Sequence, residues 1–388
     1  GKSYSYAGKQ LLSAVLGMIG MYILSKIDYR KYKKIYFLIY IVSVAVLFLV
    51  LIPGLGIEGN GARRWIAVPI INQFQPSEFT KIGLIIFFAG YLTEHKNDLR
   101  DFKKGFIIPL VYLMIPIATL YLVQNHLSAS LIIGAVACIM MVIAGTRIMY
   151  FVIFGTIGGG GLLSYVIYKI SSGASGSSLG RIVSFLDPWQ DLTGTGWQVV
   201  QGLYAIGSGG LFGVGLGESK QKYLWLSEPQ NDFIFAVIAA VAGMLFGVTY
   251  KVFEADTIEF AVIAEELGFV GCLIIMILFG ILIWRGALIA MKAPDTFGSL
   301  LAVGIVSLVA VQVVLNIAVV TSSMPNTGIP LPFFSYGGTA LMFLLCSMRN
   351  IIKYFTSRIK SIKGGSYASN NSSSRNRWTY KSWNSDCK

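Results

Sequence analysis

The chain has 388 residues, of which 55% are hydrophobic and only 13% are charged. A soluble domain usually carries about 25% charged residues, so this composition excludes an ordinary water-soluble enzyme and predicts an integral membrane protein. The net charge is +13. Much of it falls in short segments, which is typical of cytoplasmic loops and tails and does not favour a nucleic-acid partner.

Long apolar stretches follow one another along most of the chain. A spanning helix needs about 20 mostly apolar residues. The stretches that qualify predict an all-α fold, a polytopic transmembrane bundle of about 9–10 segments. They are residues 10–26, 35–53, 79–93, 106–123, 128–145, 148–168, 233–249, 260–284, 298–320 and 339–355. The glycine run 158–161 lies in the sixth, where small residues favour close helix packing.

The basic residues predict how the bundle is oriented. They cluster at 26–34, 96–104 and 349–363, which we expect to be cytoplasmic. Segment 54–77 and the large loop 169–232 then face outside. So does the N-terminus, for which a cytoplasmic start would require one more helix upstream.

The same orientation requires an odd number of crossings between residue 232 and the tail. We expect 260–284 to span, with 233–259 re-entrant or at the outer surface. The alternative is that both segments span and the C-terminal half is inverted. We therefore predict a membrane domain over 1–363 and a disordered basic cytoplasmic tail over 364–388, rich in Gly, Ser and Asn.

The first outside loop carries Arg63, Arg64 and Trp65. Arginine can bind phosphate oxygens with two parallel hydrogen bonds, and tryptophan favours the membrane interface. Substrate binding and headgroup anchoring both explain this cluster. Glu78 and Lys81 follow at i,i+3 spacing where a helix enters the membrane. They are expected to form a structural ion pair, because a lone charge there is costly.

The long outside loop contains a glycine cluster, 207–217, followed by Lys220 and Lys222. Its spacing does not match nucleotide-binding motifs, but exposed amides beside lysines can hold a pyrophosphate. A flexible loop at headgroup level is the other reading. Asp232 lies where this polar loop meets an apolar run. Partial desolvation there would raise its pKa toward the range of a general base, although a helix-capping role is equally consistent.

The last outside loop, residues 323–338, contains three prolines and three glycines and includes Ser335. Irregular backbone at membrane depth is tolerated where it lines a cavity. We therefore predict a functional role for this loop.

Several motifs occur in one order over most of the chain. They are NGARRWI at 60–66, QPSEFTK at 75–81, FLDPW at 185–189, AIGSGGLFGVGLGESKQK at 205–222, EPQNDFIFAVI at 228–238, EELGFVG at 265–271 and TGIPLPFFSYGG at 327–338. Together they resemble the SEDS family of FtsW, RodA and SpoVE. The forms at 62–65 and 228–230 are closer to FtsW and SpoVE than to RodA.

The resemblance implies a glycosyltransferase that polymerises lipid II at the outer face of the bacterial cytoplasmic membrane. The implied partners are a class B penicillin-binding protein, divisome or sporulation proteins, and membrane lipid. The family's essential aspartate falls on Asp232 and its important loop tryptophan on Trp65.

In this scheme Asp232 takes the proton of the acceptor hydroxyl and the donor's anomeric configuration inverts. The leaving pyrophosphate would be held by Arg63, Arg64, Lys220 or Lys222. Ser335 joins the substrate-binding set, while Glu78, Lys81, Glu265 and Glu266 are supporting residues. The sequence specifies no cofactor or metal ligand, although departure of a pyrophosphate is compatible with help from a divalent cation.

The chain departs from the family pattern in three ways. The family's first helix is absent, Ser227 stands where proline is usual, and residues 240–264 form an insertion that separates Asp232 from Glu265 and Glu266. A lipid II flippase, or an inactive scaffold for a penicillin-binding protein, therefore remain as alternatives to the polymerase.

Overall fold

A computed structural model describes residues 2–59, 62–68, 72–171, 189, 197–215, 259–321, 323–325, 328–333 and 339–348. Most of this chain is helical. The main helices are α1 (Lys2–Lys26), α2 (Arg30–Lys34), α3 (Tyr36–Phe48), α4 (Pro76–Glu94), α5 (Ile108–Leu122), α6 (Leu127–Ala144), α7 (Ile148–Ser171), α9 (Trp197–Gly209), α12 (Glu259–Met291), α13 (Thr296–Val320) and Thr339–Met348. Short helical turns occupy Leu49–Leu51, Lys96–Asp98 and Lys103–Ile107. Three short strands, β1 (Gly56–Gly59), β2 (Ala62–Val68) and β3 (Asn72–Phe74), join α3 to α4.

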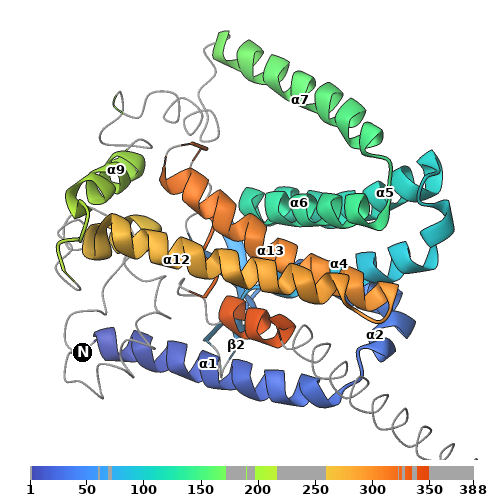
Figure 1. Ribbon diagram of the computed structural model, residues 1–388, viewed down its shortest axis with the longest axis horizontal. Helices are drawn as coiled ribbons and strands as arrows, with labels where there is room; N and C mark the ends of the chain where they lie inside the picture. Colours follow the sequence, from blue (N-terminus) through green and yellow to red (C-terminus); the bar gives the residue numbers. More distant parts are fainter. Residues whose placement is uncertain are drawn as a thin grey trace, which may run out of the picture.

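The helices confirm the predicted all-α transmembrane bundle (Figure 1). Four segments are long and apolar enough to cross a membrane, namely Lys103–Leu122, Leu127–Ala144, Glu266–Met291 and Thr296–Val320. Shorter apolar helices occupy Leu11–Leu24, Tyr36–Leu51, Ile148–Gly161 and Thr339–Met348. Each predicted segment coincides with a helix except 233–249, which lies outside the described residues, as does the predicted tail 364–388. The three strands and α9 were not predicted.

Helix α4 forms the centre of the bundle. It packs against α3, α6 and α13, and its side chains are buried along almost its whole length. Phe87 and Phe88 are fully enclosed within the main hydrophobic core. Two glycines allow α3 to approach closely, because Gly83 faces Ser43 and Gly90 faces the ring of Tyr36.

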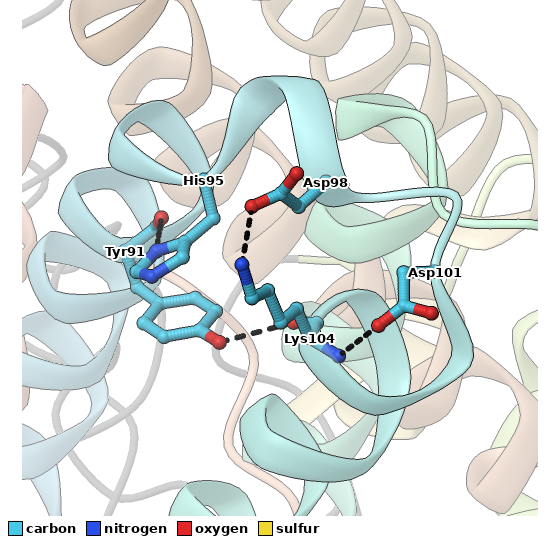
Figure 2. A network of polar contacts seen from close by, with 5 residues as sticks. All are labelled: Tyr91, His95, Asp98, Asp101 and Lys104. Carbon is cyan, nitrogen blue, oxygen red and sulfur yellow. Dashed lines mark hydrogen bonds and ion pairs between the residues drawn. The ribbon is translucent and has the colours of Figure 1, made fainter.

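The loop that connects α4 to α5 is held by a network of polar contacts (Figure 2). The Lys104 ammonium lies 2.8 Å from Asp98, and the Lys104 backbone N–H donates to Asp101 over 3.1 Å. From α4, the Tyr91 hydroxyl donates to the Lys104 carbonyl over 3.0 Å, and its ring stacks on His95. Asp98 and Asp101 thus order a basic loop that was predicted to be cytoplasmic.

The ends of the helices bear on the predicted number of crossings. The Tyr29 hydroxyl, in the first basic turn, donates to Asp295 at the start of α13 over 2.6 Å. The α12–α13 connection therefore lies at the same end as that basic turn. Of the predicted segments after residue 232, 260–284 and 298–320 coincide with helices long and apolar enough to cross a membrane, whereas 233–258 lies outside the described residues.

Helix α7 corrects one expectation. Figure 1 shows it running away from the rest of the bundle. A Cβ atom added at any glycine from 158 to 161 would meet nothing within 4 Å among the described residues. Within the part of the chain that the structure describes, the glycine run therefore has no close packing partner.

We predict that Gly83→Ala destabilises the bundle. The new methyl group would overlap the Ser43 side chain, and overpacking of this kind costs about 1–3 kcal/mol. Thermal unfolding in detergent measures the loss. The matched control is Gly134→Ala in α6, whose added carbon would only touch Ile117 at 3.7 Å. Equal stabilities of the two variants would contradict the packing described here.

Candidate functional site at the outer ends of the helices

The loop between α3 and α4 folds into an antiparallel sheet in the order β1-β2-β3. Along β1 and β2, Trp65 pairs with Ile57 and Arg63 pairs with Glu58, so Arg64 is left over as a β-bulge. Bulges redirect side chains and occur often beside functional sites. The two adjacent arginines therefore have different environments.

Arg64 joins this sheet to the turn between α5 and α6. Its Nη2 donates to the Asn125 carbonyl over 2.7 Å and its Nε donates to the Gln124 carbonyl over 3.3 Å. The fully buried Gln124 side chain donates in turn to the Leu47 carbonyl at the end of α3. Arg64 thus has a structural role, whereas the Arg63 side chain is exposed.

His126 caps α6 within the same junction. Its Nδ1 accepts from the Ala129 N–H over 3.4 Å. The side-chain nitrogen of Gln75 lies 3.0 Å from His126 Nε2. Burial, with smaller contributions from Arg64 and Lys81, lowers the pKa of His126 to about 3. The imidazole is therefore neutral at physiological pH.

One turn into α4, Glu78 and Lys81 form the predicted ion pair. Lys81 Nζ lies 2.7 Å from Glu78 Oε1, and the side chains are only 3% and 10% exposed for lysine and glutamate respectively. Buried charges at membrane depth are costly and commonly mark a functional region. The structure confirms the pairing.

Glu78 also lines a cavity of about 30 Å³. Its walls include Gln312 of α13 and the residues Pro330–Phe333 of the last outside loop. A cavity of this size accommodates one or two water molecules. The described part of the irregular loop thus lines a small cavity, and the functional role of the loop stays a prediction.

A hydrogen bond holds that loop in place, and one of its residues has a strained backbone conformation. The Asn316 side chain donates to the Ile329 carbonyl over 2.7 Å. Phe333 has a φ of 68°, a conformation that costs a non-glycine residue about 1–2 kcal/mol. Strain of this kind persists where the surroundings fix the backbone, and it gathers at functional sites.

The structure describes only part of the predicted site. Arg64 and Lys81 both lie close enough to His126 to affect its pKa, so the sheet and the start of α4 share one region. Glu266 is buried near the start of α12. Asp232, Lys220, Lys222, Ser335 and the Glu265 side chain lie outside the described residues. Within the described chain, no three His, Cys, Asp or Glu side chains are grouped to hold a metal ion.

Sequence analysis missed the polar residues that organise this region. They are Gln75, Gln124, His126, Gln312 and Asn316. One signal was available, because Gln312 and Asn316 are spaced i,i+4 in an otherwise apolar helix. Polar residues in such a position face the interior of a bundle.

The fold and this region define a polytopic membrane protein with a polar site at one end of its helices. The chain belongs to the FtsW/RodA/SpoVE family of cell cycle proteins, whose model matches residues 1–253 and 250–357. The junction of the two matches falls within the predicted insertion 240–264.

Individual relatives agree with this assignment. Stage V sporulation protein E of Bacillus subtilis is 39% identical over 358 residues, covering 91% of this chain and 88% of the relative. A probable peptidoglycan glycosyltransferase FtsW of Trichlorobacter lovleyi is 41% identical, covering 87% and 80%.

Solved structures show the same fold. A chain from a peptidoglycan synthase complex superposes with a TM-score of 0.70 at 25% identity, covering 91% of this chain and 90% of that one. Thermus thermophilus RodA has a TM-score of 0.57 at 24% identity, covering 89% and 86%.

The buried ion pair generates a stability prediction. Lys81→Met leaves Glu78 buried without its counter-charge, which typically costs about 3–5 kcal/mol. The double variant Glu78→Gln with Lys81→Met removes both charges and recovers much of that loss. Thermal unfolding of the single and double variants measures the coupling; additive losses would contradict a buried pair.

His126 generates a pH prediction. Its pKa is about 3 in the folded protein and about 6.5 when unfolded, so the unfolded state binds more protons in between. The contribution of His126 to the free energy of unfolding is therefore complete above pH 6.5 and is lost as the pH drops toward 3. His126→Asn retains a capping side chain but cannot titrate, so its unfolding temperature falls less between pH 7 and pH 5.

An identical decline in the wild type and in His126→Asn would show that His126 does not contribute.

Proposed function

We propose that the protein is a peptidoglycan glycosyltransferase that polymerises lipid II at the outer face of the cytoplasmic membrane. The observation that carries this proposal is the polar region formed by β2, α4, α13 and the last outside loop. It lies in a chain 41% identical to a probable peptidoglycan glycosyltransferase FtsW. Its buried charges and strained loop are features of a site and not of a passive bundle.

In the proposed reaction Asp232 is the general base. It accepts the proton of the acceptor sugar's 4-hydroxyl as that oxygen attacks the anomeric carbon of the donor. The bond from this carbon to the pyrophosphate oxygen breaks, and undecaprenyl pyrophosphate leaves with the bonding electrons. The proton on Asp232 then passes to water. A single displacement of this kind inverts the anomeric configuration.

The leaving group requires positive charge where its own negative charge develops. Arg64 donates to the backbone carbonyls of the α5–α6 turn, which gives it a structural role. Arg63, whose side chain is exposed, is the loop arginine proposed to contact the leaving group. Lys220 and Lys222 complete the proposed set, with Trp65 and Ser335 as substrate contacts. Glu78, Lys81, Glu265 and Glu266 support the site.

The partner in this proposal is a class B penicillin-binding protein, in division or in sporulation. Two relatives support it. A similar chain is part of a peptidoglycan synthase complex, and another relative is a sporulation protein.

Transport of lipid II is the second candidate function. The Glu78–Lys81 pair is expected of this function as well as of the polymerase, because charges inside a membrane bundle often line a substrate path. A flippase would move lipid II between leaflets without forming glycan chains, so the products separate the two functions.

The test is polymerisation of labelled lipid II by the purified chain with a class B penicillin-binding protein. We predict that the wild type forms glycan chains and that Asp232→Ala lowers the rate by about 10²- to 10⁴-fold, the usual contribution of a general base. Deletion of residues 240–264 tests whether the insertion is tolerated. Labelled lipid that crosses the bilayer while no chains form would reject the polymerase in favour of the flippase.

A further inference from the structure

Helix α12 is interrupted near its outer end. Gly268 has φ 66° and ψ −169°, which are not helical values. The break interrupts the regular hydrogen bonding of the helix, so the backbone groups around it need other partners. In an apolar environment each backbone group without a hydrogen bond costs roughly several kcal/mol of folding free energy.

These partners come from the chain that follows α9. The Phe269 N–H donates to the Gly210 carbonyl over 2.9 Å, and the Val270 N–H donates to the Leu211 carbonyl over 3.1 Å. In the opposite direction, the Gly215 N–H donates to the Glu266 carbonyl over 3.1 Å. We name this set of backbone bonds, between residues 210–215 and 266–270, the glycine clasp.

Two glycines make the clasp sterically feasible. A Cβ atom on Gly213 would overlap the Glu266 carbonyl and lie 2.7 Å from Gly268 N. A Cβ atom on Gly268 would overlap Gly213 N and lie 2.7 Å from the Leu211 carbonyl. Both residues also have positive φ, 78° and 66°, which disfavours any side chain. The obstacles are backbone atoms, which cannot move aside as a flexible side chain can.

The clasp connects the long outside loop to the rest of the polar region. Below it, Ala205 of α9 packs with Cys272 and Val320, which ties α9 to α12 and α13. Figure 1 shows α9 beside the beginning of α12. Next to the break, Leu267 packs against the hydrophobic cluster that contains Leu331, and Phe333 packs against the same cluster.

Leu331 and Phe333 also line the cavity at Glu78. The interruption of α12 is therefore the place where α9, the last outside loop and the α4 charges are held together. Buried Glu266 lies within the clasp itself, two residues before the break.

We propose that Gly213 and Gly268 are positioning residues of the glycosyl transfer, an inference that rests on the function proposed above. They contact no substrate. They fix the chain at Gly215, from which the sequence continues to Lys220, Lys222 and Asp232, and they fix Glu266 relative to the cavity at Glu78. Small misplacements of catalytic groups reduce turnover more than they reduce substrate binding.

The experiment compares Gly213→Ala, Gly268→Ala and the double variant in lipid II polymerisation with the partner protein. We expect kcat to fall by roughly 10- to 100-fold while KM changes by less than about threefold. Both substitutions disrupt the glycine clasp, so the kcat of the double variant should be only slightly lower than that of the less active single variant. Hydrogen exchange, followed by mass spectrometry, should show faster exchange at the Gly215, Phe269 and Val270 amides.

Two other glycines serve as controls. Gly280→Ala in α12 adds a methyl group that meets no described atom within 4 Å, so kcat and exchange should match the wild type. Gly286→Ala adds one against Val306, between α12 and α13. It should reduce thermal stability without changing kcat per folded molecule, which separates positioning from general destabilisation.

Clasp variants that lose kcat while remaining folded support the inference. Clasp variants that exchange faster but retain wild-type kcat overturn it, as does a loss of activity no larger than the loss of folded protein. A wild type that forms no polymer rejects the proposed function and the inference with it, whereas an active wild type with fully active clasp variants rejects the inference alone.

Discussion

The architecture depends on one constraint, which is that backbone polar groups inside a bilayer must find partners within the protein. Regular helices meet this constraint by themselves. The outer part of this bundle does not consist of regular helices alone, because α12 is interrupted at Gly268 and the chain after α13 is irregular. Within the described residues, both of these irregular stretches have specific partners. The α9 end bonds to α12, and Asn316 holds the Ile329 carbonyl.

The same constraint explains why polar side chains gather at this end of the bundle. Arg64 satisfies carbonyls of the α5–α6 turn, Gln124 satisfies a carbonyl at the end of α3, and His126 caps α6. Once these groups hold the irregular backbone, the Glu78–Lys81 pair can be buried beside a small polar cavity. The region proposed to bind lipid II is thus formed by the same polar contacts that satisfy the irregular backbone.

Features with a local cause were predictable from the sequence. Apolar runs located the helices, and the i,i+3 spacing of Glu78 and Lys81 was sufficient to predict their pairing. Proline and glycine density identified the irregular loop after α13. The ordered motifs indicated the family, and its model matches the chain.

Features that depend on distant contacts were not predictable. The strands around Trp65 are short and pair through a bulge, which hides the alternating pattern. Helix α9 ends in a glycine-rich segment with little helical preference, and it is held by packing against Cys272 and Val320. The contact between Gly213 and Gly268 has no sequence signature. Each position requires glycine only because backbone atoms of the other segment lie too close for a side chain.

The most direct test of the central claim is the anomeric configuration of the glycan linkages that the purified chain and its partner form from lipid II. A single base acting in a single displacement predicts that every new linkage is inverted relative to the donor. Linkages that retain the donor configuration would require a second displacement and a covalent intermediate, and would contradict the role given to Asp232.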